Sequence, residues 1–306
     1  MLAFLKLIRW KNLLMIALAQ VLVKYALFSA DFGVTTTFNE KGFALLVLAT
    51  LLIAAAGYII NDIFDVDTDS VNRPEKMIIG NGIAEKHAYN FYAALTIAGV
   101  GLGFYLSNMI GRPGFAAIFV LISALLYVYA SNLKQMPVIG NVTVALIVGI
   151  SLLIVGVFEL LPAMTEQNRS TQITFFRILL DYALFAFGIT LVREMVKDIE
   201  DIDGDYNAGM KTLPIQIGRE RSGKVVFVLS LIPLIGVIFY IVTFLYKQPV
   251  AVGYFLLLIL APLILFAVKS FQAETKEQWH WLSNLLKLVM LTGILSLFLY
   301  PLILLK

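Results

Sequence analysis

Nine long apolar segments dominate this sequence and limit what it can fold into. Each is close to the length of about 20 residues that an α-helix needs to cross the hydrocarbon core of a bilayer. Only 14% of the 306 residues are charged, whereas soluble domains carry about 25%. The sequence therefore predicts an all-α membrane protein in which residues 1–306 form a single polytopic membrane domain. The expected spans are 13–30, 43–60, 88–107, 114–130, 138–157, 176–196, 223–246, 250–269 and 282–304.

Basic residues indicate which side of the membrane each loop should occupy. The N-terminus and the segments on its side carry 15 lysines and arginines, and the opposite side carries six. Because cytoplasmic loops are enriched in these residues, we expect the N-terminus in the cytoplasm. Two lysines, Lys24 and Lys287, fall inside predicted spans. Glu159 and Glu166 fall in the predicted loop 158–175 on the opposite side and are expected to be solvated.

Two aspartate-rich windows nearly repeat each other at a constant offset of 136 residues. Residues 61–69 read NDIFDVDTD, and residues 197–205 read KDIEDIDGD. Together they hold eight of the ten aspartates in the chain. Because uncompensated charge beside a membrane is costly, we expect these windows to carry the chemistry. They follow the second and sixth predicted spans, so both should lie on the cytoplasmic side after helices that run in the same direction.

Helical spacing divides these aspartates into two sets. Within each window, three of them have the spacing i, i+3, i+7 and share one face if the helix continues through them. This set comprises Asp62, Asp65, Asp69, Asp198, Asp201 and Asp205. Asp67 and Asp203 would point elsewhere. Three carboxylates on one face repel each other and need neutralising cations, and oxygen ligands favour hard ions, so Mg²⁺ is the first candidate.

Four kinds of acidic segment could explain the windows. Their identical spacing argues against a merely solvated loop. An EF-hand fails because loops that begin at Asp65 or Asp201 lack the glycine at position 6 and the glutamate at position 12. A cation transporter usually has inverted repeats with its acids near the midplane, whereas these windows are parallel and lie at the ends of spans. A metal–diphosphate site would need basic side chains close by, and the windows are flanked by Arg73, Lys76, Lys197 and Lys211.

A diphosphate site inside a membrane protein suggests a prenyl diphosphate as the substrate. Metal ions would stabilise the departing diphosphate, and a slot between apolar helices would hold the prenyl tail. We therefore expect a bundle of nine transmembrane helices around a central cavity open to the cytoplasm. Asn141, in the fifth predicted span, could reach this site. Thiolate metal sites are excluded because the chain has no cysteine.

The two windows resemble the motifs of the UbiA-type intramembrane prenyltransferases. The first follows the pattern Asn-Asp-x-x-Asp-x-x-x-Asp from Asn61 and continues into Asn72-Arg73-Pro74. The second resembles Lys-Asp-x-x-Asp-x-x-Gly-Asp from Lys197, and Thr212-Leu213-Pro214 follows it. The resemblance covers essentially the whole chain and implies Mg²⁺-dependent transfer of a prenyl group.

The same resemblance implies roles for individual residues. At the metal–diphosphate site it places Asn61, Asp62, Asp65, Asp69, Asp198, Asp201 and Asp205. Arg73 and Lys197 would contact phosphate oxygens, and Lys134 is a further candidate for a diphosphate contact. Many relatives carry Tyr-x-x-x-Lys in this loop, whereas the spacing from Tyr129 to Lys134 is one residue longer and leaves the role of Tyr129 open.

The stretch 193–201, REMVKDIED, resembles the branch of the family that makes digeranylgeranylglyceryl phosphate, an ether lipid. That branch implies transfer of a geranylgeranyl group to a glycerol-phosphate lipid, and the basic residues Arg193, Lys76 and Lys211 would suit a phosphorylated acceptor. An aromatic acceptor, such as 4-hydroxybenzoate or a quinone precursor, is the alternative within the family, and cation transport is the alternative outside it. The expected partners are a prenyl diphosphate, a membrane-resident acceptor and the lipid bilayer of the cell or inner membrane. No nucleic acid or obligate protein partner is inferred.

Overall fold

The computed structural model describes residues 2–72, 74 and 77–304. These residues contain nine helices that are long and apolar enough to cross a membrane, as the sequence predicts, and they contain no β-strand. Four of the membrane-length helices are uninterrupted: α3 (Glu40–Phe64), α5 (Glu85–Met109), α7 (Ile139–Glu159) and α8 (Arg169–Glu200). The other five each combine an α-helix with π- or 3₁₀-helical turns. They are α2 (Trp10–Leu22) with the π-helix η1 (Val23–Leu27); η4 (Pro113–Phe115) with α6 (Ala116–Ser131); α11 (Arg219–Tyr240) with η6 (Ile241–Leu245); α12 (Pro249–Phe255) with η7 (Leu256–Leu260) and α13 (Ala261–Gln272); and α14 (Lys276–Leu295) with η8 (Ser296–Leu299). The shorter elements are α1 (Leu2–Leu7), η2 (Ala30–Phe32), α4 (Val66–Asn72), η5 (Leu133–Gln135), α9 (Ile202–Asn207), α10 (Leu213–Ile217) and α15 (Tyr300–Leu304).

Helix α8 is longer than the sequence predicts. The apolar pattern indicates a span at 176–196, whereas the helix runs from Arg169 to Glu200. Hydropathy detects only the part of a helix that lies in hydrocarbon, and the polar turns at both ends of α8 remain helical. The last turns of α8 therefore carry the first residues of the second aspartate window.

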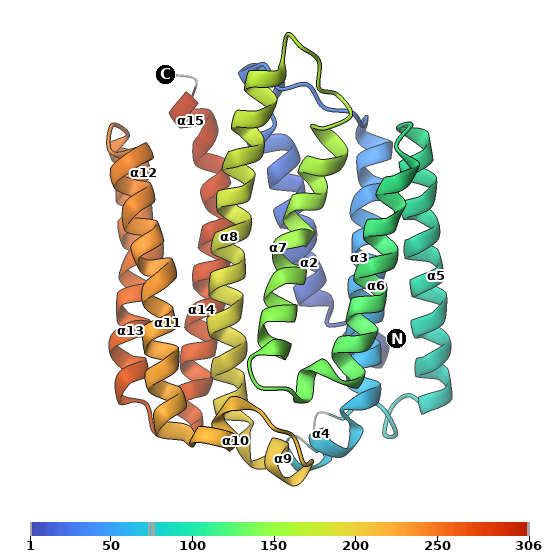
Figure 1. Ribbon diagram of the computed structural model, residues 1–306, viewed down its shortest axis with the longest axis vertical. Helices are drawn as coiled ribbons and strands as arrows, with labels where there is room; N and C mark the ends of the chain where they lie inside the picture. Colours follow the sequence, from blue (N-terminus) through green and yellow to red (C-terminus); the bar gives the residue numbers. More distant parts are fainter. Residues whose placement is uncertain (1, 73, 75–76, 305–306) are drawn as a thin grey trace.

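Helix α8 stands in the middle of the bundle and joins its two halves (Figure 1). On one side it packs against α7, and on the other it packs against α11 and α14. Helix α3 packs against α5 and α6. The short helices α4 and α9, which contain the last residues of the two aspartate windows, contact each other at one end of the bundle. The topology thus brings together two segments that are 136 residues apart in the sequence.

Local sequence signals set several of these elements. The side chain of Asn39 accepts a hydrogen bond from the backbone N–H of Gly42 and caps the start of α3. Thr275 and Gln278 form a capping box at the start of α14. Gly103 on α5 lies against the ring of Phe119 on α6, where a Cβ atom would come within 2.3 Å of the ring. A glycine is therefore required there for the close approach of these helices.

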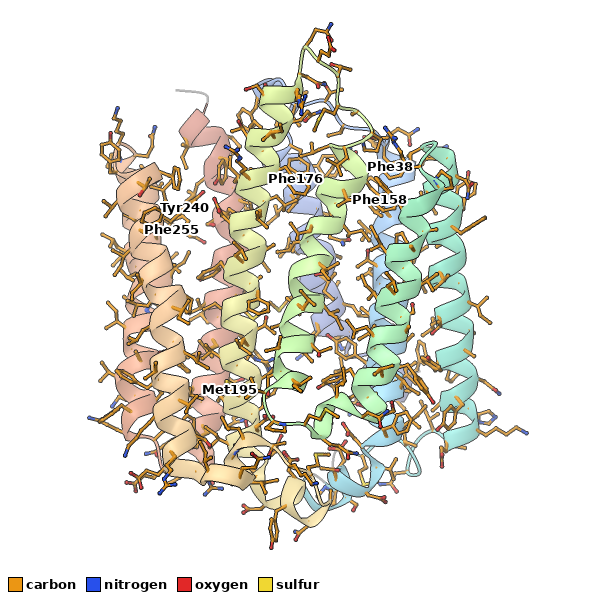
Figure 2. The ribbon with its side chains drawn as sticks, in the orientation of Figure 1. Phe38, Phe158, Phe176, Met195, Tyr240 and Phe255 are labelled. Carbon is orange, nitrogen blue, oxygen red and sulfur yellow. The ribbon has the colours of Figure 1, made fainter. Side chains whose placement is uncertain are left out.

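The end of the bundle opposite α4 and α9 contains a buried ion pair. Lys24 Nζ lies 2.8 Å from Glu159 Oε1, and the two side chains are 8% and 0% exposed. The prediction of a solvated Glu159 is wrong because α7 ends inside the bundle, where the backbone N–H of Phe38 also donates to this carboxylate. Glu166 is exposed, as expected. The ring of Phe38 stacks on that of Phe158 at this end of the bundle (Figure 2).

Candidate functional site

A cavity of about 1120 Å³ lies between the membrane-length helices. Its apolar part is lined by side chains from six helices, including Ile16, Ile53, Phe119, Ile147, Phe185 and Ile294. Phe119 packs against Phe158, so the apolar part reaches the aromatic cluster at the far end of the bundle. Both aspartate windows line the polar part of the same cavity. The fold therefore joins a charged region to a long apolar chamber.

The repeat between the windows extends to their backbone geometry. Asp65 is the C-cap residue of α3, with φ −94° and ψ 1°, and Asp201 is the C-cap residue of α8, with φ −99° and ψ 9°. In both windows a second, short helix begins at the next residue. Asp69 N and Asp205 N donate hydrogen bonds to the carbonyl oxygens of Asp65 and Asp201, respectively. Each window is thus a break between a spanning helix and a short one, rather than the continuous helix on which the spacing argument was based.

The break does not change which aspartates reach the cavity. The six with i, i+3, i+7 spacing all line it: Asp62, Asp65, Asp69, Asp198, Asp201 and Asp205. Asp67 is exposed, and the side chain of Asp203 is 83% exposed with Arg219 Nη2 at 3.7 Å. The prediction that these two point elsewhere is confirmed, because a short helix that restarts at once keeps nearly the same angular spacing.

The first cluster is partly neutralised by residues from two other segments. Arg9 Nη2 donates to Asp62 Oδ1 at 2.7 Å, and its guanidinium carbon lies 5.0 Å from the centre of the Tyr58 ring. Asn61 Nδ2 donates to Asp65 Oδ2 at 2.6 Å, and Lys134 Nζ forms an ion pair with the same oxygen. Burial and the neighbouring Asp65 carboxylate raise the pKa of Asp69 to about 6. An additional cation would therefore be stabilised at this cluster.

The second cluster is positioned by α7 and α8. Asn141 Nδ2 on α7 donates to Asp198 Oδ2 at 2.9 Å, so the predicted reach of Asn141 into this region is seen. Glu194 lies between two cations of α8: its Oε1 accepts from Arg193 Nη1 at 3.0 Å and from Lys197 Nζ at 2.7 Å. Both cations and the carboxylate line the cavity. Glu194 thus fixes the direction of two basic side chains at the polar end.

The loop that carries Lys134 is held close to the start of α7. A Cβ atom at Gly140 would lie 2.9 Å from the carbonyl oxygen of Leu133, so only glycine allows this approach. Val138 has a φ of 65°, a value that a β-branched residue rarely adopts. Strain of this kind persists only where surrounding contacts impose it. Here the imposed conformation places Lys134 against the first cluster.

The donor set of the two clusters fits a hard divalent cation. Carboxylate and amide oxygens are the ligands that Mg²⁺ prefers. As the side chains stand, no three acidic or histidine residues in the described ranges are close enough to hold a metal ion. Asp62 and Asp65 are instead paired with Arg9 and Lys134. A bound cation would take over the role of these two basic side chains.

The remaining predicted site residues differ in whether the structure describes them and in whether they line the cavity. Arg73 and Lys76 lie outside the described residues. Lys211 is exposed and does not line the cavity, and its backbone N–H donates to the Gln135 carbonyl oxygen. Its proposed contact with an acceptor is therefore not supported. Tyr129 does line the cavity despite its altered spacing from Lys134.

Two charged residues at this site were not singled out from the sequence. Arg9 has the appearance of an ordinary basic residue before a first span, and nothing in its spacing indicates Asp62 as its partner. Its φ of 49°, between α1 and α2, turns the chain so that the guanidinium reaches the first cluster. Glu194 was visible only as part of the stretch 193–201. Its position three residues before Lys197 could have indicated an ion pair between the two, since residues at this spacing share a helix face.

Comparison with known proteins identifies the family. The model of the "UbiA prenyltransferase family" matches residues 17–291. The chain belongs to the UbiA prenyltransferase family. This membership places it among enzymes and sets aside the cation-transporter alternative.

Two curated relatives in the UbiA family carry the name digeranylgeranylglyceryl phosphate synthase. The protein from Korarchaeum cryptofilum is 31% identical over 265 residues, which cover 84% of this chain and 85% of the relative. The protein from Methanoculleus marisnigri is 34% identical over 183 residues, and this match spans only 60% of either chain.

Solved structures of UbiA proteins share the fold. A structure described as giving insights into digeranylgeranylglyceryl phosphate synthase in membranes has a TM-score of 0.62 and 26% identity, and the match covers 97% of this chain and 98% of that one. A UbiA homologue from Archaeoglobus fulgidus, bound to DMAPP and Mg²⁺, has a TM-score of 0.54 and 15% identity, with 96% and 98% of the two chains covered. These matches confirm the predicted nine-helix architecture over nearly the whole chain.

Proposed function

We propose that this protein transfers a geranylgeranyl group from geranylgeranyl diphosphate to the hydroxyl of a glycerol-phosphate lipid. One observation carries the proposal: two matched aspartate windows, with basic side chains between them, meet at the polar part of a large apolar cavity. Relatives that are 31% and 34% identical are named digeranylgeranylglyceryl phosphate synthase, and this supports the choice of acceptor.

The six cavity-lining aspartates would bind the diphosphate through Mg²⁺, with Asn61 and Asn141 orienting their carboxylates. When bound, Mg²⁺ neutralises the diphosphate and stabilises the charge that develops as it leaves. Lys134 and Lys197 line the same region and would contact phosphate oxygens directly. Arg9 is the further basic candidate at this cluster. Charge-assisted hydrogen bonds of this kind are stronger than neutral ones, so they would fix the position of the departing group.

The apolar part of the cavity would hold the prenyl tail and exclude water from the reacting carbon. In the proposed reaction the bond between C1 of the prenyl chain and the diphosphate oxygen breaks. The acceptor hydroxyl oxygen then forms an ether bond to C1, and its proton passes to the released diphosphate. Exclusion of water matters because an allylic cation at C1 would otherwise be hydrolysed.

An acceptor panel tests this function. Purified protein with labelled geranylgeranyl diphosphate and Mg²⁺ should label geranylgeranylglyceryl phosphate and leave 4-hydroxybenzoate and a naphthoate acceptor unlabelled. The physical reason is that a cavity with several basic side chains favours a phosphorylated acceptor. Thin-layer or liquid chromatography of the products gives the measurement. Labelling of only an aromatic acceptor would overturn the ether-lipid assignment while retaining prenyl transfer.

We also propose that the cavity opens to the cytoplasm. The excess of lysine and arginine on the side of the aspartate windows supports this orientation. Because the chain has no cysteine, single substitutions can report it directly. In intact bacterial cells, a membrane-impermeant maleimide should label Glu166→Cys but not Asp203→Cys, and both should react after permeabilisation. Labelling of Asp203→Cys in intact cells would reverse the orientation.

A further inference from the structure

Lys287 is a lysine deep in a membrane-length helix, and the proposed reaction leaves it without a role. It lies eleven residues beyond the first residue of α14, about 16 Å along the helix axis. Its side chain is exposed and lines the same cavity as the aspartate windows. Because ionisable residues inside membrane spans are costly, they usually mark a functional site.

Two contacts show which residue of α8 lies at the level of Lys287. His280 Nδ1 on α14 lies 2.9 Å from Glu200 Oε1 on α8. At the other end, Tyr182 and Ser296 are joined by a hydrogen bond of 2.7 Å. The two helices are therefore antiparallel and keep a nearly constant register, as their paths in Figure 1 also show.

This register places Arg193 opposite Lys287. Arg193 precedes Glu200 by seven residues, and Lys287 follows His280 by seven residues. Both positions are thus about 10 Å from the His280–Glu200 contact along their helices. Both side chains line the cavity. Two cations from different helices therefore lie at one level on the α8–α14 wall.

Arg193 retains capacity to bind a further anion. Its Nη1 donates to Glu194 at 3.0 Å, and the side chain lines the cavity. A guanidinium has five N–H donors, so this bond leaves others for a ligand. An oxyanion in the cavity between Arg193 and Lys287 could accept from them.

The basic side chains at this level suit a phosphomonoester. Arg193 and Lys287 each carry a positive charge, and Glu194, beside Arg193, carries one negative charge. A phosphomonoester carries a charge of about −2 near neutral pH. We propose that Lys287 and Arg193 together bind the phosphate of the lipid acceptor, an assignment that rests on the proposed function.

The position also suits the reaction. Arg193 lies five residues from Asp198, so the cation pair is about 7 Å farther into the membrane than the second aspartate cluster. Only a few bonds separate the phosphate of a glycerol phosphate from its free hydroxyl. A phosphate held at the cation pair would therefore leave the hydroxyl beside C1 of the donor. The acceptor and the diphosphate would occupy separate anion sites in one cavity.

Lys287→Met tests the assignment, because it removes the charge and keeps an unbranched side chain of similar length. Binding of geranylgeranylglyceryl phosphate and of geranylgeranylglycerol, which lacks the phosphate, is measured in nanodiscs without donor or Mg²⁺. We expect Kd for the phosphorylated lipid to rise at least about tenfold and Kd for the other lipid to stay unchanged. Lys287→Arg should retain binding of the phosphorylated lipid.

Lys269→Met is the matched control, since Lys269 is an exposed lysine on α13 that does not line the cavity. It should bind both lipids as the unaltered protein does. Equal affinity of Lys287→Met and the unaltered protein for the phosphorylated lipid would overturn the assignment, and so would an equal loss for both lipids. If the unaltered protein binds the phosphorylated lipid but never prenylates it, the proposed function fails while the binding comparison still decides the role of Lys287.

Discussion

Replacing Asp198 with asparagine should reduce prenyl transfer at least about 1000-fold while the protein stays folded. Asn141 Nδ2 donates to Asp198 Oδ2 at 2.9 Å, and an asparagine oxygen could still accept this hydrogen bond. The substitution therefore removes a negative charge with little change in shape. Metal ions that stabilise a leaving group contribute several kcal/mol, and a 1000-fold loss corresponds to about 4 kcal/mol. Asp62→Asn should have a comparable effect in the first cluster.

The measurement is Mg²⁺-dependent release of diphosphate from geranylgeranyl diphosphate, together with formation of the prenylated acceptor. Each window provides its own control. Asp203→Asn removes the same charge from the second window, and Asp67→Asn removes it from the first, but neither side chain lines the cavity. Both controls should keep activity within a few-fold of the unaltered protein.

Two results would contradict the proposed site. Retention of activity within tenfold in both Asp62→Asn and Asp198→Asn would show that the windows do not bind the diphosphate. A loss in Asp203→Asn as large as that in Asp198→Asn would show that the total negative charge of the window matters, and not the face that reaches the cavity. Thermal unfolding of each variant separates either result from misfolding.

The architecture was accessible from the sequence because membrane insertion imposes a strong local rule. Each span must be helical and about 20 residues long, so hydropathy alone finds all nine. The ends were less predictable, as α8 shows, because helical hydrogen bonding continues beyond the apolar part. The sequence also predicts that Asp62 reaches the cavity and Asp67 does not. This prediction needs only the rule that residues three or four apart share a helix face, which is a property of local helix geometry.

Contacts between distant segments could not be read from the sequence. Asp62 and Arg9 are 53 residues apart, and their pairing depends on how the α1–α2 turn lies against α3. The level shared by Lys287 and Arg193 depends on the antiparallel register of two helices whose linking segments give no such information. In each case the residue type indicates that a partner is needed, and only the packed structure shows which residue it is.

Glu159 illustrates the same limit and leads to a second strong expectation. Its position at the end of an apolar segment suggested solvent, yet its side chain is fully buried beside Lys24. Lys24 Nζ also donates to the carbonyl oxygen of Phe38 at 2.9 Å, and the backbone N–H of Phe38 donates to Glu159 Oε2 at 3.0 Å. The ion pair therefore ties η1, the segment before α3 and the end of α7 together.

Replacing Lys24 with methionine should lower the free energy of unfolding by about 3–5 kcal/mol. The substitution leaves the Glu159 carboxylate buried without its countercharge, and the low exposure of both side chains keeps water from compensating. The measurement is the unfolding transition of the protein in detergent, monitored by circular dichroism as denaturant concentration or temperature rises. The protein that remains folded should keep its affinity for the prenyl diphosphate, because Lys24 does not line the cavity.

A double substitution and an exposed ion pair make the test specific. Lys24→Met with Glu159→Gln should be less destabilised than Lys24→Met alone, because no uncompensated charge remains buried. Lys224 and Glu220 form a pair of nearly the same length, 2.7 Å, but their side chains are 59% and 84% exposed. Lys224→Met should therefore unfold like the unaltered protein, since solvent screens such pairs. Equal stability of Lys24→Met and Lys224→Met would show that burial gives the Lys24–Glu159 pair no special importance. A double variant as unstable as Lys24→Met would show that the stability is lost through packing of the lysine stem and not through its charge.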